Sequence, residues 1–278
     1  MKIGIFPPYG TDLERNIEYC VDAKVHYVGL GPGHFEIREP DGIPTFTQFD
    51  LARVAYSKYD IMIYCYTPPY ASLAALEDEG EMERETGVLN EIIIRLGAAG
   101  IPALHFYATR PLASAFDDER EKLRERLVEY YQRIVPTAER AHVKIATHPS
   151  CMRPVVLDSY HRVAWLCEQV PSDYNGFLLC NGMAYLAGDE PADIIRQYPE
   201  KIFLVHMRDI IGRHARFEEP LLGEGEIDIA EVFRALYEID FQGVMFPEHF
   251  LPIAGDHAKA LSWNIGYMKG MAQALRSH

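Results

Sequence analysis

The chain has 278 residues, of which 48% are hydrophobic and 24% are charged, and its formal net charge is −14. This length suits two small domains or one α/β barrel, for which roughly 250 residues is typical. The acidic balance argues against a nucleic-acid-binding protein, because phosphates favour a basic face. No apolar run reaches the roughly 18 residues that a membrane span needs.

The first residues, MKIGIFPP, read directly as a strand and lack the long apolar region of a signal peptide. The chain has five cysteines, and their odd number and wide spacing are unlike a disulfide framework. We therefore expect a cytoplasmic protein that binds neither nucleic acid nor membranes, with homo-oligomerisation left open.

Short apolar runs alternate with longer amphipathic stretches along the chain. The predicted strands are 2–6, 26–31, 60–66, 101–107, 143–148, 176–181, 202–208 and 243–249. The predicted helices are 11–24, 46–58, 81–99, 117–141, 158–169, 190–198, 228–239 and 258–276. The helix at 117–141 has the clearest helical spacing of apolar residues, and Asp228 is a suitable N-cap with Glu231 three positions on.

This strict alternation predicts an α/β fold of the (β/α)₈ (TIM) barrel type that forms a single domain over residues 1–278. A doubly wound open sheet is the alternative, but the glycines at 29, 31 and 33 are not followed by the helix start of a phosphate-binding fingerprint. The longer loops at 32–46, 66–80 and 209–227 all follow strands, so we expect them at one mouth of the barrel.

Four successive strands end in a side chain with a lone pair for a cation: His148, Cys180, His206 and Glu248. The carboxyl ends of parallel barrel strands converge on one mouth, where barrel enzymes place their chemistry. Two imidazoles, a thiolate and a carboxylate suit Mn²⁺, Fe²⁺, Co²⁺ or Zn²⁺. The sequence therefore predicts a metalloenzyme.

From about residue 87 onward the chain resembles mannonate dehydratases, a family of the xylose isomerase-like TIM barrels. The matching segments are 94–102 (IRLGAAGIP), 147–149 (THP), 179–182 (LCNG), 205–208 (VHMR), 217–218 (FE), 225–228 (GEID), 247–249 (PEH) and 265–270 (IGYMKG). The resemblance implies a metal site on His148, Cys180, His206 and Glu248, an acid/base role for His249, and Mn²⁺ as the expected ion.

The chain departs from the family pattern at three places. Its last ligand is Glu248 where the family has Asp, which lengthens the arm by one methylene. The loop after that strand is cut to residues 250–256 and lacks the tyrosine that the family uses in its chemistry. The segments that follow Tyr107 and His148 are also abbreviated. We therefore interpret the chain as a divergent and shortened member.

Each candidate ligand also has a plain structural interpretation. His148 and His206 can be satisfied histidines at strand ends, and Cys180 can be a small buried hydrophobe. Glu248 can be a general base with no metal. Cys65 and Cys151 are interpreted as core or rim residues.

His249 is the first catalytic candidate, because its pKa range suits proton transfer near neutrality. It can instead be packed behind the barrel or support the site indirectly. Arg208 follows His206 by two residues and so points the same way, which suits a paired grip on a substrate carboxylate. Its alternative is a structural ion pair with Asp209, Glu218 or Glu219.

Further residues are predicted to line the mouth. The substrate-binding candidates besides Arg208 are Tyr107, Arg110 and Arg153. His105, Tyr9, Tyr66 and Tyr70 can also line it, although most of these are expected to be packing residues. The loop at 217–228 is either a lid hinged at Gly223 and Gly225 or a solvated acidic turn.

These residues favour a metal-dependent dehydratase that converts an aldonic acid into a 2-keto-3-deoxy sugar acid. The main alternative is an isomerase or epimerase of a neutral sugar, which would not need Arg208. A decarboxylase of a keto sugar acid and a non-catalytic metal- or sugar-binding barrel are the remaining interpretations.

Overall fold

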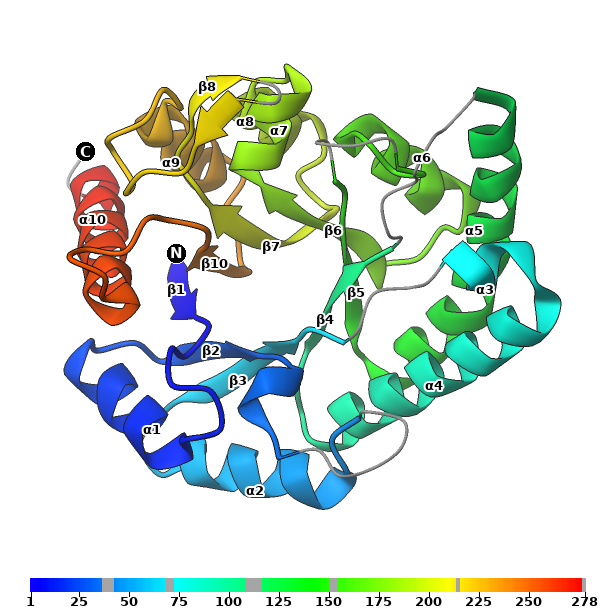
Figure 1. Cartoon of the computed structure of the whole chain (residues 1–278), viewed down its shortest axis with the longest axis horizontal. Helices are drawn as coiled ribbons and strands as arrows, with labels where there is room; N and C mark the ends of the chain where they lie inside the picture. The colour runs from blue at the N-terminus through cyan, green and yellow to red at the C-terminus, as the bar shows by residue number, and fades with distance from the viewer. Residues whose placement is uncertain (37–42, 69–72, 109–116, 151–154, 214–215, 277–278) are drawn as a thin grey trace.

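The computed structural model describes residues 1–36, 43–68, 73–108, 117–150, 155–213 and 216–276. Eight parallel strands form a closed barrel in the order β1-β10-β7-β6-β5-β4-β3-β2. The strands are β1 (Lys2–Ile5), β2 (Tyr27–Leu30), β3 (Met62–Tyr66), β4 (Ala103–Tyr107), β5 (Lys144–His148), β6 (Asn175–Cys180), β7 (Ile202–Met207) and β10 (Val244–Pro247). Figure 1 looks down this barrel.

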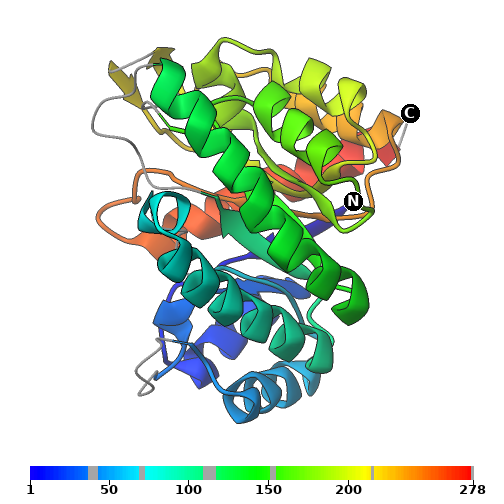
Figure 2. The same ribbon diagram turned by 90° about the vertical axis from the view of Figure 1, so that its right-hand side faces the viewer.

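Helices surround the barrel on its outside (Figures 1 and 2). They are α1 (Leu13–Asp22), α2 (Phe46–Ser57), α3 (Leu73–Glu77), α4 (Glu79–Ala98), α5 (Asp117–Ala141), α6 (Tyr160–Gln169), α7 (Asn181–Ala187), α8 (Pro191–Gln197), α9 (Ile229–Glu238) and α10 (His257–Arg276). A short 3₁₀ turn covers Pro32–His34, and β8 (Ile211–Arg213) pairs with β9 (Arg216–Glu218) as an antiparallel hairpin. None of the helices in the described ranges is long and apolar enough to cross a membrane.

The eight barrel strands and the eight predicted helices are confirmed within a few residues at each end. The open-sheet alternative is wrong, because the eight strands pair in a closed ring, in which β1 joins β10 to β2. At the predicted N-cap of α9, the Asp228 side chain accepts a hydrogen bond from the Glu231 backbone N–H. The predicted apolar face of α5 is buried, as Leu127 and Tyr131 show.

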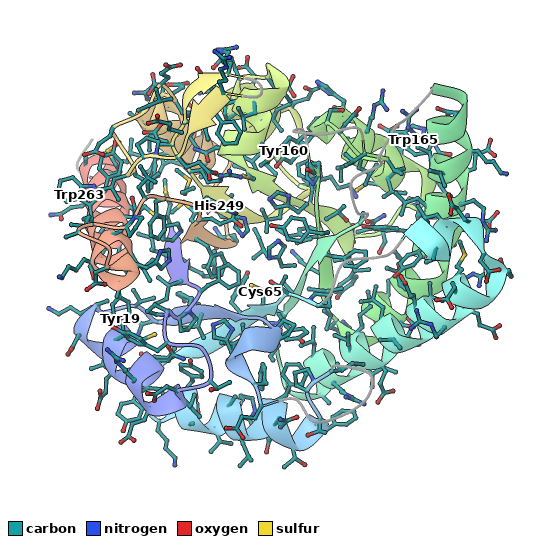
Figure 3. All side chains as sticks on the ribbon, in the orientation of Figure 1. Tyr19, Cys65, Tyr160, Trp165, His249 and Trp263 are labelled. Atoms are coloured by element: carbon teal, nitrogen blue, oxygen red, sulfur yellow. The ribbon has the colours of Figure 1, made fainter. Side chains whose placement is uncertain are left out.

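The core has two parts. A large cluster fills the space between the strands and the helices, and a smaller one lies inside the barrel around Cys65, Leu178, Leu204 and Phe246. Cys65 is thus a core residue, as expected, and Figure 3 places it well inside the ring of helices. The helices and packed strands hold the carboxyl ends of the strands in fixed register, and the candidate site lies at those ends.

Candidate metal centre and active site

The four strand-end residues lie on neighbouring strands. His148 ends β5, Cys180 ends β6, His206 lies on β7 and Glu248 directly follows β10, and these strands adjoin one another in the barrel. Cys180 pairs in register with His206. The closed barrel therefore brings together side chains that are up to 100 residues apart in sequence.

Three of these side chains present their ligand atoms to a common point. One ligand atom each from His148, His206 and Glu248 lies within 4.8 Å of the other two. His148 Nδ1 lies 2.6 Å from the Pro149 carbonyl oxygen, which only an N–H can satisfy, so Nε2 keeps its lone pair. Among the described residues, neither His148 Nε2 nor His206 Nε2 has a hydrogen-bond partner.

Buried polar atoms without partners are rare in proteins and call for an explanation such as an ion. Two imidazole nitrogens and a carboxylate oxygen are a donor set that Zn²⁺ and other first-row divalent ions accept. The residues present therefore fit a divalent metal ion.

Glu248 is the electrostatic centre of the cluster. Its Oε2 lies 2.8 Å from His206 Nδ1, its Oε1 accepts a hydrogen bond from the Tyr107 hydroxyl at 3.4 Å, and His249 Nε2 lies 3.6 Å from Oε1. Burial opposes ionisation of Glu248, but His206 and the neighbouring imidazoles outweigh burial and hold its pKa well below the usual range. The side chain is thus an anion that is ready to neutralise a cation.

Cys180 lies behind this group. Its backbone N–H donates to the Tyr160 hydroxyl, which lies 2.5 Å away, and its Sγ lies 3.6 Å from Arg208 Nη1. Burial raises the pKa of the thiol, and the neighbouring Arg208 partly offsets that effect. The group of mutually close ligand atoms found in the described chain does not include Cys180, so its role as a fourth ligand stays a prediction.

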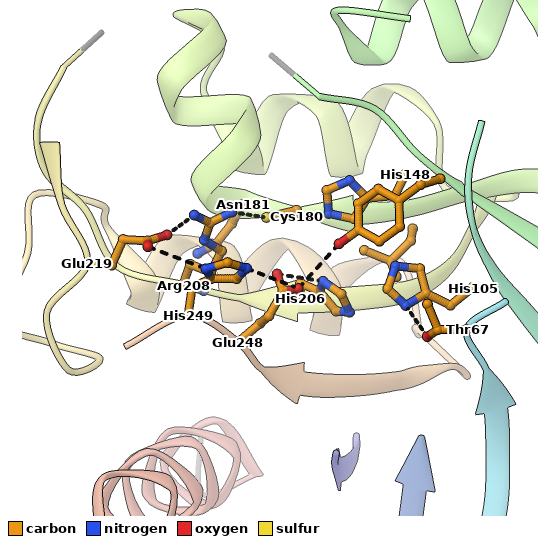
Figure 4. A network of polar contacts seen from close by, with 12 residues as sticks. Thr67, His105, His148, Cys180, Asn181, His206, Arg208, Glu219, Glu248 and His249 are labelled. Carbon is orange, nitrogen blue, oxygen red and sulfur yellow. Dashed lines mark hydrogen bonds and ion pairs between the residues drawn. The ribbon is translucent and has the colours of Figure 1, made fainter. Parts of the chain in front are cut away.

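Arg208 is buried, with 2% of its side chain exposed. Its guanidinium forms an ion pair with Glu219, one of the three carboxylates considered from the sequence, and its backbone N–H donates to Asn181 Oδ1 at 2.7 Å. Figure 4 shows Arg208 between Glu219 and Cys180. The predicted grip on a substrate carboxylate stays a prediction, and it requires the guanidinium to exchange Glu219 for the substrate.

His249 lies at the mouth because the backbone bends there. Its φ of 48° is in the left-handed region, which is uncommon for a residue other than glycine. Strict alternation along a strand would turn His249 away from Glu248, whereas this bend places the two side chains beside each other. The ring is 53% exposed, its Nδ1 lies 3.4 Å from Glu219 Oε2, and burial lowers its pKa against the opposing effect of Glu248.

The loop after β9 is fixed by Asp209. Oδ2 of this buried carboxylate accepts hydrogen bonds from the backbone N–H groups of Gly223 and Gly225, and Oδ1 accepts from Ile210 and Ile227. A Cβ at Gly225 would come within 2.1 Å of Asp209 Oδ1, so the turn needs glycine there. These contacts favour a folded turn that presents Glu219 to the site, and hinge motion stays a prediction.

From the sequence, His105 is one of several residues that can line the mouth, most of which are expected to be packing residues. His105 lies on β4 with 3% of its surface exposed, and its ring centroid lies 4.8 Å from that of His206. The period-2 pattern of β4 carried a signal, because His105 and Tyr107 share one face. Tyr66 is fully buried against Phe49, as expected for a packing residue.

Some of the predicted positions lie outside the described residues. They are Tyr70, Arg110, Cys151 and Arg153. For Tyr107, the hydroxyl contact with Glu248 places the side chain beside the candidate metal centre.

Comparison with known proteins agrees with this geometry. A family model described as D-mannonate dehydratase (UxuA) matches residues 69–277, which is more than half of the chain. The chain belongs to the D-mannonate dehydratase family. The resemblance seen from residue 87 onward is thereby confirmed, and it begins somewhat earlier.

The mannonate dehydratase of Rhizobium meliloti (strain 1021) is 31% identical over 179 residues, which are 55% of this chain and 44% of that protein. The chain thus spans about half the length of the relatives that it matches in sequence.

Solved structures extend the likeness of the fold to the whole chain. The mannonate dehydratase of Streptococcus suis superposes with a TM-score of 0.81 at 20% identity, covering 100% of this chain and 95% of that chain. The IolI protein, solved with a bound zinc atom, superposes with a TM-score of 0.79 at 16% identity and 99% coverage of both chains. The predicted xylose isomerase-like barrel is confirmed.

Proposed function

We propose that the chain is a metal-dependent hydro-lyase that removes water from an aldonic acid to give a 2-keto-3-deoxy sugar acid. The observation that carries the proposal is the meeting of His148, His206 and Glu248 ligand atoms within 4.8 Å at the mouth of a barrel. Membership in the mannonate dehydratase family supplies the reaction class.

His148, His206 and Glu248 would hold the divalent ion, with Cys180 as a further ligand from the neighbouring strand. A bound ion supplies Lewis-acid polarisation of the substrate carboxylate and its neighbouring hydroxyl, which acidifies the proton on C2. Mn²⁺ is our first candidate, with Fe²⁺, Co²⁺ and Zn²⁺ as alternatives. The zinc atom of the structurally similar IolI protein supports a divalent ion without deciding between them.

His249 is the residue of this chain best placed to move a proton. Its ring is partly exposed at the mouth, and Nε2 lies 3.6 Å from Glu248 Oε1. Because burial lowers its pKa, the ring is largely neutral near pH 7. It can take up a proton and return it to the departing 3-hydroxyl, which is how a general acid/base works near neutrality. Tyr107 and Glu248 line the same cavity and would hold the substrate beside His249.

One observation favours a second candidate, an isomerase or epimerase that acts on a neutral sugar. Arg208 is already paired with Glu219, and the described lining of the cavity beside Glu248 contains neither Arg nor Lys. A neutral sugar needs no cationic partner. In the dehydratase, Arg208 must turn from Glu219 to the substrate, or Arg110 and Arg153 must bind the carboxylate.

Two measurements test the proposal. Elemental analysis of the purified protein is expected to give about one divalent ion per chain. A panel of hexonates and pentonates, incubated with the Mn²⁺-loaded protein and assayed for 2-keto acids, is expected to give product from at least one acid. Turnover of uncharged sugars alone would assign the chain to the second candidate.

A further inference from the structure

A fourth imidazole stands beside the three-residue group. His105 projects from β4, and its ring centroid lies 4.8 Å from that of His206 and 5.7 Å from that of His148. The ring is buried and lies tilted against the ring of Phe6, which follows β1, with 6.1 Å between the centroids. Figure 4 shows His105 and His249 on either side of the His206–Glu248 pair.

Only one of the two nitrogens of His105 is satisfied by the protein. Nδ1 lies 2.9 Å from the Thr67 hydroxyl oxygen, a contact that fixes the orientation of the ring. Nε2 is buried and has no hydrogen-bond partner within the described part of the chain. A buried nitrogen of this kind is rare and calls for an explanation such as a bound ligand. Because a neutral imidazole offers one donor and one acceptor, a hydroxyl group suits Nε2 in either tautomer.

A substrate hydroxyl is a better partner for His105 Nε2 than the metal ion is. The group of mutually close ligand atoms in the described residues is His148, His206 and Glu248, and His105 is not a member. His105 therefore lies beside the candidate metal centre, and the measurement of metal content below tests whether it is a ligand.

A cavity of about 320 Å³ connects His105 to the catalytic candidates. Its polar lining includes His105, Tyr107, Glu248 and His249, and its apolar wall includes Phe6 and Phe250. A chain of carbons that carries both hydroxyls and C–H groups suits a cavity lined by both polar and apolar side chains.

We propose that His105 binds a hydroxyl of the substrate's polyhydroxy chain through Nε2, and so positions that chain against Glu248 and His249. This inference rests on the proposed function, because it takes the ligand to be a sugar acid or a related polyol. Thr67 acts through His105 by holding its ring in place.

Two substitutions test the roles of the two ring nitrogens of His105 separately. His105→Asn keeps a polar group at the reach of Nδ1 and can retain the Thr67 contact, but it loses the Nε2 atom. His105→Gln carries its amide to the reach of Nε2. Binding of D-mannonate and of the neutral polyol D-mannitol to the Mn²⁺-loaded protein is measured by calorimetry, with metal content and melting temperature measured in parallel.

His105→Asn is expected to weaken binding of both probes by about tenfold, the effect of losing one hydrogen bond of ordinary strength. His105→Gln is expected to restore most of that affinity, with metal content and melting temperature close to wild type in both variants. Wild-type affinity in His105→Asn overturns the proposal. Loss of the metal in His105→Asn also overturns it, because that result makes His105 a ligand.

A second measurement uses only the wild-type protein, so it does not depend on whether a variant folds. In the Zn²⁺-loaded wild-type protein with ¹⁵N-labelled histidine, the Nε2 resonance of His105 is expected to shift when D-mannitol is added, and its constancy would count against the proposal. Failure of the proposed function has a different signature. A wild-type protein that binds D-mannonate but forms no 2-keto acid is not the dehydratase, while the affinities of the two variants still decide the role of His105. A wild-type protein that binds neither probe overturns the hydroxyl site itself.

Discussion

Replacing Asp209 with alanine tests whether one buried carboxylate fixes the loop that carries Glu219. Its two oxygens accept four backbone hydrogen bonds, from Ile210, Gly223, Gly225 and Ile227. The N–H groups of Ile210 and Ile227 are buried, and each loses a charged acceptor at a cost of roughly 1–3 kcal/mol. The two glycine N–H groups are more open and can be hydrated, so each costs less. We expect the free energy of unfolding to fall by about 4 kcal/mol.

Urea unfolding followed by circular dichroism measures this loss. A matched control is Asp22→Ala on the exposed face of α1, which is expected to change the free energy of unfolding by less than about 0.5 kcal/mol. Proteolysis provides a local measure, since the segment 210–227 should be cleaved faster in Asp209→Ala than in the control. A loss under about 1 kcal/mol together with unchanged cleavage would refute the reasoning.

Three further predictions concern the site. His206→Ala should hold less than a tenth of the wild-type metal by elemental analysis. A chelator should lower the melting temperature of the wild-type protein but not that of His206→Ala. Normal metal content in the variant would show that His206 is not a ligand. Burial lowers the pKa of His148 to about 3, while the unfolded ring titrates near ~6.5. The unfolded state therefore binds more protons below that pH, and the metal-free protein should lose stability between about pH 6.5 and pH 3, by up to about 1.4 kcal/mol per pH unit. Urea unfolding at several pH values in this range should show that the free energy of unfolding depends less steeply on pH in His148→Gln than in wild type. An equal dependence on pH would contradict the lowered pKa of His148. Arg208→Lys should lower kcat/KM for aldonic acids by roughly 30-fold, because an ammonium cannot form the two parallel hydrogen bonds that a guanidinium makes to a carboxylate. An unchanged kcat/KM would mean that Arg208 only forms the ion pair with Glu219 and does not bind the substrate.

The barrel could be predicted because its signals are local. Each strand is a short apolar run between turn residues, and each long helix repeats its apolar residues with helical spacing. The short elements were not predicted. Helix α7 (Asn181–Ala187) begins directly after Cys180 and is buried along most of its length, so it shows no polar face from which a helical period can be recognised.

The meeting of His148, His206 and Glu248 could be predicted because each lies at or next to the end of a strand, and parallel strands of a barrel end at one mouth. For Arg208 the sequence offered three possible carboxylate partners, and only the fold of the segment after the hairpin selects Glu219 among them. Strict alternation along the strand would turn His249 away from Glu248, and the left-handed backbone at that residue provides the bend that brings the two side chains together. Such a bend depends on tertiary packing, which the local sequence does not encode.

Three strands, β1, β2 and β3, come from residues that precede the family match at 69–277. They complete the closed barrel, and Phe6, which follows β1, lies edge-on to His206 with 5.9 Å between the ring centroids. The candidate metal ligands His148, His206 and Glu248 thus lie within the part of the chain that the family model matches, whereas Phe6, which lines the neighbouring cavity, lies outside that match. A substitution at Phe6 can therefore reshape one wall of this cavity while it leaves the three candidate ligands and the strands that carry them unchanged.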